Sequence, residues 1–229
     1  KGGISKQFLI NIPSKYTNNT SYNTTRRHLN VLVNYLNEHG FDIQKSTLKT
    51  RKQNETLHKP INDVKGLLDE VYYFNKNLHL CCLLTYCCLL RPHQEIRRLK
   101  WSDFSEDLNT ISLSGSKVKS KRNRVVPVPI YIRELLVKGQ PQHNIFTDTT
   151  RPLNEDYFKT IWSRFKRVSK LLEQDQTLYS FRHSGAIEIF KRTGSITKLQ
   201  KAMGHSSINV SLTYLRGLEI AELKEEDMP

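Results

Sequence analysis

The chain has 229 residues, of which 37% are hydrophobic and 25% charged, and it carries a net charge of +14. This length allows one large domain or two modest ones, and the most apolar stretch, residues 78–90, is shorter than the roughly 20 apolar residues that a membrane span requires. The positive charge predicts a polyanionic partner, usually nucleic acid. A membrane partner is disfavoured because the chain has no basic amphipathic helix of the interfacial type.

The N-terminal quarter of the chain is polar and rich in Asn, Thr and Lys. One amphipathic helix is predicted over residues 26–37, ending at Gly40, and residues 46–59 have the pattern of a basic linker. No charged-then-apolar leader follows Lys1, so we expect no signal peptide. The change in pattern predicts two parts, residues 1–58 and residues 59–229.

Beyond this boundary the apolar pattern becomes dense. A helix is predicted to begin at Pro60, and a buried helix over 78–90 to end at Arg91, because proline disfavours helix in the residue before it. Another helix is predicted from Pro92 to about Leu99.

The cysteines all fall in the buried helix, as two adjacent pairs without metal-ligand spacing: Cys81, Cys82, Cys87 and Cys88. We therefore expect free, mostly buried thiols, no metal site, and a reducing compartment, the bacterial cytoplasm.

Residues 110–114 alternate in hydrophobicity, and residues 124–128 form a plausible returning strand, which together predict a β-hairpin with a basic tip. The next helix is predicted from a cap at Asn154. Two more are predicted over 180–193, with Ser180 as the cap and Gly194 as the stop, and over 195–203, with Gly204 as the stop, and an acidic one over 219–227. The expected fold class is mainly α with a small antiparallel β-sheet.

Cleaving a phosphodiester without a metal requires a nucleophile, cations that hold the phosphate, and an acid for the leaving oxygen. Arg91 ends a buried helix and needs an anionic partner, for which Glu95 is the ordinary structural choice. Arg182 stands at a helix start that favours an anion, while His183 alone is more often structural. An isolated tyrosine such as Tyr214 is usually part of a core, and a basic run such as 117–124 is usually solvated.

Taken in order, four segments resemble the motifs of tyrosine recombinases, the phage integrase family. They are Leu90-Arg91-Pro92 through Asp103, Lys119 through Pro127, Tyr179-Ser180-Phe181-Arg182-His183, and Met203-Gly204-His205-Ser206-Ser207 followed by Thr213-Tyr214. The amino-acid sequences of the first and third segments are most similar to those of integrases from Bacteroidetes mobile elements.

The resemblance implies a catalytic domain over 59–229, preceded by the C-terminal part of a helical core-binding domain over 1–58. It also implies that Tyr214 is a nucleophile forming a 3′-phosphotyrosine, without metal or nucleotide cofactor. Its catalytic partners are the phosphate clamps Arg91 and Arg182, the general acid Lys119 and the hydrogen-bond donor His205.

Two positions depart from the family pattern. Tyr179 stands where the family usually has a histidine; a phenol with a pKa of about 10 is a poor base, so we expect Tyr179 to donate a hydrogen bond to the phosphate. Three residues lie between Arg91 and Glu95, where the family usually has two. Residues four apart still lie on one face of a helix, so the contact between the two side chains is expected to form. The choice of Lys119 over Lys117 or Lys121 depends on its spacing from Pro127.

The expected partners are double-stranded DNA, other copies of the chain in a tetramer on DNA, and a host DNA-bending protein. The acidic C-terminal segment, residues 218–223, either packs on its own domain or docks on a neighbouring protomer. The residues expected to contact DNA are basic and lie in the hairpin tip or the N-terminal part: Lys117, Lys121, Arg122, Arg124, Arg26, Arg27, Arg51 and Lys52.

Other functions remain open at this point. A type IB topoisomerase would use the same chemistry to relax supercoils, and a non-catalytic or regulatory DNA-binding module would keep the fold as a platform. A helix-turn-helix repressor would explain the charge but not the five residues Arg91, Lys119, Arg182, His205 and Tyr214.

Overall fold

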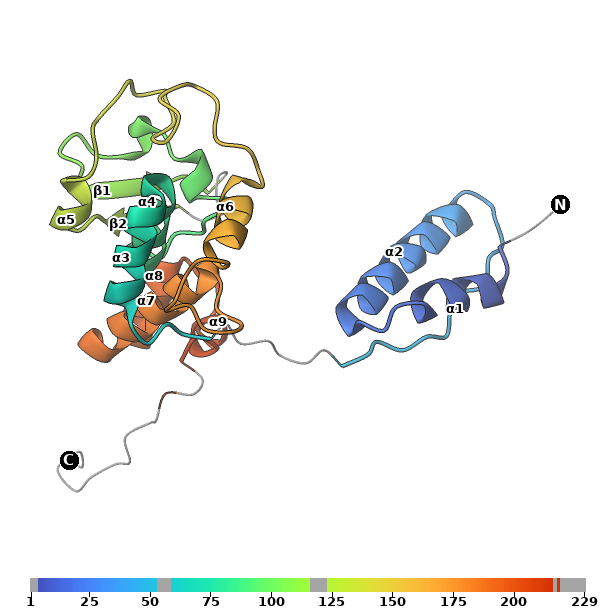
Figure 1. Ribbon diagram of the computed structural model, residues 1–229. Helices are drawn as coiled ribbons and strands as arrows, with labels where there is room; N and C mark the ends of the chain where they lie inside the picture. The colour runs from blue at the N-terminus through green and yellow to red at the C-terminus, as the bar shows by residue number, and fades with distance from the viewer. Residues whose placement is uncertain (1–3, 53–58, 116–122, 216–217, 219–229) are drawn as a thin grey trace, which may run out of the picture. The chain divides into compact units, whose positions relative to one another are not determined.

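The computed structural model describes residues 4–52, 59–115, 123–215 and 218. The chain divides into two compact units, Lys1–Thr56 and Leu57–Pro229 (Figure 1). Helices and one two-stranded antiparallel sheet make up the regular structure of the described residues, so the predicted fold class is confirmed. None of the described helices combines the length and hydropathy that crossing a membrane requires.

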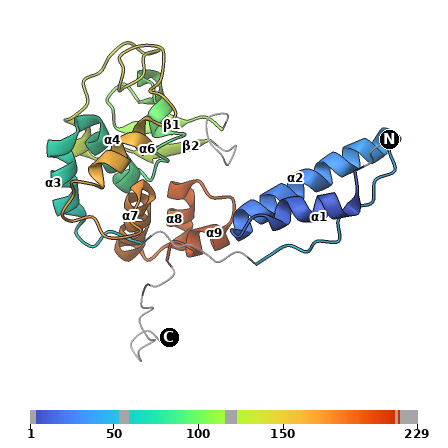
Figure 2. The same cartoon turned by 45° about the vertical axis from the view of Figure 1, so that its right-hand side comes forward.

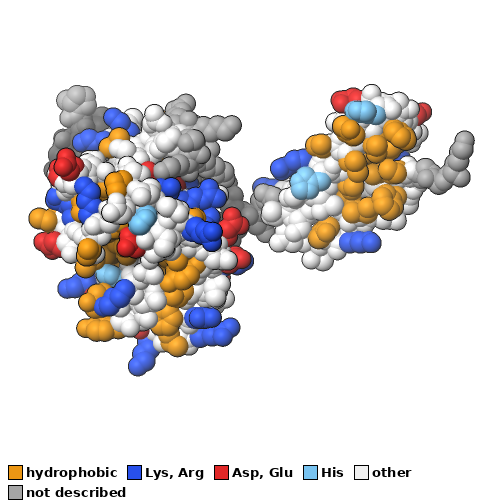
Figure 3. Space-filling view, turned by 90° about the horizontal axis from the view of Figure 1, so that it is seen from above, with side chains coloured by type: hydrophobic (Ala, Val, Ile, Leu, Met, Phe, Trp, Pro, Cys, Tyr) orange, Lys and Arg blue, Asp and Glu red, His pale blue; other side chains and the backbone are white. Residues whose placement is uncertain are grey.

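The first unit contains two helices, α1 (Lys6–Ser14) and α2 (Asn19–Glu38). The predicted helix is present as α2 but begins earlier, because the Asn18 side chain accepts hydrogen bonds from the backbone N–H groups of Thr20 and Ser21. Helix α1 was not predicted, since it is short and contains Pro13. Figure 3 shows apolar side chains gathered on one face of this unit.

The chain after α2 differs from the predicted linker. Residues 41–52 lack helix or strand but are bonded to α2 through their backbone. The Asn23 side chain donates to the Arg51 carbonyl at 2.7 Å and accepts from the Arg51 N–H at 2.9 Å. Arg26 donates through Nε to the Leu48 carbonyl at 2.6 Å. This segment is therefore part of the first unit.

The second unit is built on helices α3 (Val64–Phe74), α4 (Lys76–Cys87) and α7 (Leu178–Thr193), with α4 packed against both others. The helix predicted at Pro60 begins at Val64, where Asp63 caps it. The predicted continuation of α4 to residue 90 is wrong, because Leu89 has a φ of 51° and turns the chain.

Pro92 starts no α-helix. The residues after it form turns and a short 3-10 helix, η1 (Ile96–Arg98), followed by a second, η2 (Trp101–Asp103). Strands β1 (Thr110–Leu113) and β2 (Arg124–Pro127) form the predicted hairpin, in which Leu113 pairs with Arg124. Figure 2 shows this hairpin beside the C-terminal helices, and β2 contacts α8.

The remaining helices are short. They are α5 (Ile130–Arg133), α6 (Tyr157–Phe165), α8 (Ile196–Met203) and α9 (Ile208–Leu212). The cap of α6 is Asp156, two residues later than the predicted cap at Asn154. The predicted stops at Gly194 and Gly204 are confirmed by φ angles of 60° and 67°. The predicted acidic helix 219–227 lies outside the described residues.

Two details of the second unit bear on the sequence predictions. The cap of α7 is Thr177, and Ser180 instead accepts a hydrogen bond from the Thr177 N–H as the third helical residue, so the prediction of Ser180 as cap is wrong. The cysteines are free: Cys81, Cys82 and Cys88 are buried and Cys87 is half-buried.

The contact between α4 and α7 is close enough to require glycine. A Cβ atom added to Gly185 would overlap the Tyr86 carbonyl oxygen, which belongs to the backbone and cannot move independently. We predict that Gly185→Ala lowers the free energy of unfolding by about 1–3 kcal/mol, measured by urea denaturation. Gly66→Ala is the matched control and should lose less, because its nearest neighbour is the Asp63 side chain. Equal losses would contradict the close-contact explanation.

Candidate active site

The turn after α4 brings Arg91 to a buried carboxylate. Glu95, whose side chain is fully buried, lies 2.5 Å from Arg91 Nη1 and also accepts from the Arg91 backbone N–H at 2.8 Å. The turn is closed by the Glu95 and Ile96 N–H groups, which donate to the Arg91 carbonyl. The expected pairing of Arg91 with Glu95 is thus present despite the extra residue between them.

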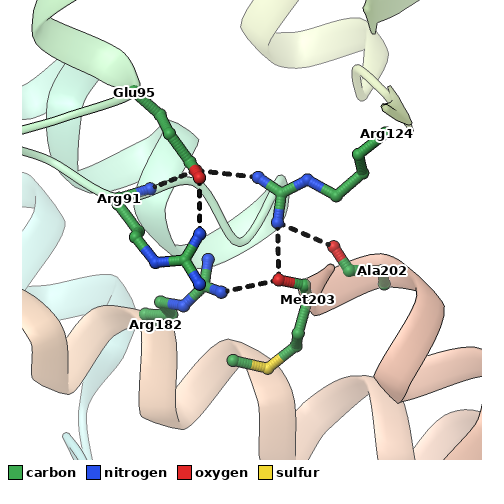
Figure 4. Close-up of polar contacts among 6 residues, drawn as sticks. All are labelled: Arg91, Glu95, Arg124, Arg182, Ala202 and Met203. Carbon is green, nitrogen blue, oxygen red and sulfur yellow. Dashed lines mark hydrogen bonds and ion pairs between the residues drawn. The ribbon is translucent and has the colours of Figure 1, made fainter. Parts of the chain in front are cut away.

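Arg124 has a different environment from the one expected of a DNA contact. Its side chain is 4% exposed and reaches into the protein from the first position of β2. Nη2 lies 2.8 Å from Glu95 Oε2, and Nη1 donates to the Met203 carbonyl at 2.7 Å and to the Ala202 carbonyl at 3.3 Å (Figure 4). A guanidinium buried in this way does not face a DNA backbone, so Arg124 is removed from the predicted DNA contacts.

Arg182, a third arginine near Arg91 and Arg124, lies on α7 and is fully buried. Its Nη2 donates to the Met203 carbonyl at 3.0 Å, whereas Nε and Nη1 have no hydrogen-bond partner among the described residues. Burial, together with the charges of Arg91 and Arg124, lowers the pKa of Arg182 to about 10, although Tyr214 and Glu95 act in the opposite direction. The group remains cationic at neutral pH.

We call Arg91, Arg124, Arg182 and Glu95 the arginine cluster. Three guanidinium charges meet one carboxylate, which leaves two positive charges uncompensated among its members. Because unpaired buried charge is costly, such a cluster has a strong affinity for an anion. The two free N–H groups of Arg182 provide donors for it.

His205 and Tyr214 lie after α8. The left-handed Gly204 ends that helix, and His205 Nδ1 lies 3.0 Å from Ser211 Oγ of α9. The Tyr214 ring is half-buried, with its centroid 5.4 Å from the His205 ring and 5.5 Å from that of His183. Tyr214 also interacts electrostatically with Arg182. The fold therefore brings the predicted nucleophile to the arginine cluster.

The imidazole of His205 is held neutral at physiological pH. Burial is the main cause and the cations Arg182, Arg91 and Arg124 add to it, which together lower the pKa of His205 to about 4. A neutral imidazole carries one N–H and can still donate one hydrogen bond.

Tyr179 is a half-buried neighbour of the cluster. Burial raises its pKa, while Arg91 and Arg182 act in the opposite direction. A phenol with a raised pKa keeps its proton at neutral pH, which favours the expected role of donor over that of base. The ring of His93, from the turn after Arg91, lies 6.3 Å from the Tyr179 ring.

The remaining predicted site residues divide in two groups. Lys117, Lys119, Lys121 and Arg122 lie outside the described residues. In the first unit, Arg27 and Lys52 are exposed, but Arg26 is bonded to the Leu48 carbonyl and Arg51 stacks on the Tyr22 ring at 3.8 Å. The latter two have structural roles in this unit.

Three features were not foreseen from the sequence. They are the internal position of Arg124, the bond between Ser211 and His205, and the contact of His183 with Tyr214. Strand alternation was an available signal for the first, since Arg124 shares the buried face of β2 with Val126. The other two depend on how α7, α8 and α9 pack, which local patterns do not specify.

The arginine cluster predicts a large stability effect at Glu95. Glu95→Gln removes the one negative charge and leaves Arg124 buried beside a neutral amide, so the free energy of unfolding should fall by about 3–5 kcal/mol in a denaturant titration. Glu188→Gln is the control, because its ion pair with Arg192 is exposed and should contribute less than about 1 kcal/mol. A small loss for Glu95→Gln would contradict the assigned charge balance.

The titration of His205 is a second prediction. Its imidazole resonances should titrate near pH 4 in an NMR experiment, and Arg91→Met should raise the midpoint by removing a nearby cation. The folded-state pKa lies below the ordinary value of 6.5, so the unfolded chain binds the proton more readily and stability falls as the pH drops from about 6.5 toward 4. A midpoint near 6.5 in the unaltered protein would exclude this environment.

Comparisons with solved structures agree with the fold. The chain is similar to the XerH site-specific recombinase bound to palindromic difH substrate in a post-cleavage complex, with a TM-score of 0.71 and 19% identity over 92% of this chain and 66% of that one. It is also similar to lambda integrase (75–356), a dimer bound to a COC′ core site, with a TM-score of 0.70 and 18% identity over 97% and 84% of the two chains. At these identities the likeness concerns the fold.

Sequence comparison gives the family. The chain is 25% identical over 164 residues to the integrase of Escherichia phage P2, an alignment that takes in 70% of this chain and 43% of that protein. It thus spans less than half the length of this curated relative. The model of the phage integrase family matches residues 60–219. The chain belongs to the phage integrase family.

Proposed function

We propose that this chain is the catalytic part of a site-specific DNA recombinase or integrase that cleaves and rejoins strands through a 3′-phosphotyrosine. One observation carries the proposal: three arginines and one carboxylate form a cationic cluster with Tyr214 close by, and two nitrogens of Arg182 in it have no partner in the part of the chain that the structure describes. A scissile phosphate supplies the missing negative charge. Membership in the phage integrase family and the net charge of +14 support the same reading.

The chemistry follows from these groups. The Tyr214 oxygen attacks phosphorus as its proton passes to solvent water, the bond from phosphorus to the 5′-oxygen breaks, and that oxygen takes a proton from a general acid. Arg91 and Arg182 neutralise charge on the non-bridging oxygens during the attack. Lys119 is the proposed acid, with Lys117 and Lys121 as alternatives.

Rejoining reverses the first step. A free 5′-hydroxyl of a partner strand attacks the phosphotyrosine as its proton passes to the deprotonated general acid. The bond from phosphorus to the Tyr214 oxygen then breaks, and the tyrosine takes a proton from solvent water. His205 and Tyr179, both neutral at physiological pH, donate hydrogen bonds to the phosphate. The phosphodiester energy is retained in the protein–DNA bond, so the reaction needs no nucleotide cofactor.

The proposed partners are double-stranded DNA at recombination sites, further copies of the chain as a tetramer, and a host DNA-bending protein. In this scheme residues 1–58 belong to a core-binding domain, with exposed Arg27 and Lys52 as its DNA contacts. The acidic segment 218–223 docks on a neighbouring protomer. We place the enzyme in the bacterial cytoplasm and its origin in a mobile element of Bacteroidetes.

The nucleophile is tested with a nicked suicide substrate, a DNA end from which the short cleaved strand diffuses away. We expect an adduct that resists SDS and is attached to the 3′ side of the break, and we expect Tyr214→Phe to form at least about 1,000-fold less of it, because no other group supplies the attacking oxygen. Tyr157→Phe serves as the control for removal of a phenolic hydroxyl.

The other outcomes separate the alternatives. Tight binding of the native end without an adduct would favour a non-catalytic DNA-binding module. Relaxation of supercoiled DNA through Tyr214, without strand exchange between two sites, would favour a topoisomerase.

A further inference from the structure

Arg124 occupies a central position in the arginine cluster although its side chain is 4% exposed. Nη2 of its guanidinium bonds to Glu95, and Nη1 bonds to the last two carbonyls of α8, those of Ala202 and Met203. Figure 4 shows these groups on three separate parts of the fold: the turn after α4, strand β2 and the end of α8. Arg124 therefore joins elements that are far apart in the sequence.

Two of the three acceptors of Arg124, Glu95 and the Met203 carbonyl, each also hold a second arginine. Glu95 receives Arg91 at 2.5 Å, and the Met203 carbonyl receives Arg182 at 3.0 Å. Arg91 therefore shares the acceptor Glu95 with Arg124, and Arg182 shares the Met203 carbonyl with it. A shift of this guanidinium changes the positions of both acceptors.

The turn before His205 packs closely against the Arg124 side chain. Gly204 has a φ of 67°, and a Cβ atom there would lie 3.1 Å from Arg124 Cδ and 3.3 Å from Nη1. The backbone that leads from α8 to His205 therefore passes directly over Arg124. This approach couples the position of His205 to the same guanidinium.

We propose that Arg124 is a positioning residue for strand cleavage, which fixes Arg91 through Glu95 and fixes Arg182 and the His205 turn through the end of α8. It does so without contacting DNA. The inference depends on the proposed function, because cleavage is the step that this positioning serves. Small displacements of such a frame reduce a reaction rate strongly, by about 100-fold for a shift of about 1 Å.

Two simpler roles for Arg124 make different predictions. A DNA contact would contribute to binding and to its salt dependence, since each neutralised phosphate adds about 0.9 to the slope of log K against log salt concentration. A purely structural crosslink would alter stability while leaving the cleavage rate of the folded, DNA-bound protein unchanged. Binding and cleavage must therefore be measured separately.

The experiment compares Arg124→Met and Arg124→Lys with the unaltered chain on the nicked suicide substrate. Cleavage is followed in single turnover at saturating protein and well below each melting temperature, and DNA affinity is measured at several salt concentrations. Arg97→Met is the matched control: Arg97 is also buried and bonded to carbonyls, those of His93 and Leu153, but it has no bond to Glu95 or Met203.

We expect Arg124→Met to bind DNA with an unchanged salt slope and to cleave about 100-fold more slowly. Arg124→Lys should recover part of this loss but stay about 10-fold below the unaltered chain, because a single ammonium replaces a planar group that serves a carboxylate and two carbonyls at once. Arg97→Met should cleave at close to the unaltered rate. The Lys variant decides the matter if the Met variant does not fold.

A variant of Arg124 that cleaves at the unaltered rate when saturated with DNA would overturn the inference. A salt slope lower by about one, with normal cleavage at saturation, would assign Arg124 to DNA binding instead. Absence of any adduct from the unaltered chain would overturn the proposed function, and this inference with it. An adduct from the unaltered chain with normal rates in both Arg124 variants would overturn this inference alone.

Discussion

The second unit depends on one buried carboxylate, Glu95, and on the charge that this carboxylate leaves unbalanced. Glu95 bonds to Arg91 and Arg124 from a fully buried position, while Arg182 lies beside them on the Met203 carbonyl. A single negative charge makes it possible for the arginines to be close together inside the protein. Because it does not neutralise them, the cluster keeps its affinity for one more anion, and this connects the stability of the fold to its proposed chemistry.

The helix ends around the cluster provide its geometry. The left-handed Leu89 ends the approach from α4 and directs Arg91 to Glu95, and the left-handed Gly204 ends α8 where its last carbonyls meet Arg124 and Arg182. These carbonyls form the negative end of the helix dipole, which adds to their attraction for guanidinium groups. The same turn begins the segment that leads through His205 to Tyr214.

Much of this arrangement could be predicted from the sequence, because its signals are local. The stops at Gly194 and Gly204, the hairpin and the Arg91–Glu95 pair follow from turn residues, alternation and spacing. Arg124 could not be placed by its charge, since whether a guanidinium points to solvent or to a buried carboxylate depends on distant segments. Helix α1 has too weak an apolar pattern to be distinguished from its polar surroundings.

The most direct test of the account is a structure of the covalent complex formed on the nicked suicide substrate. The account predicts phosphorus bonded to the Tyr214 oxygen. It also predicts that Arg182 Nε and Nη1, which have no partner among the residues described here by the structure, donate to the non-bridging oxygens. It also predicts that Arg124 keeps its bonds to Glu95 and Met203 and does not reach the DNA. A phosphate bound elsewhere, with these two nitrogens still unpartnered, would contradict it.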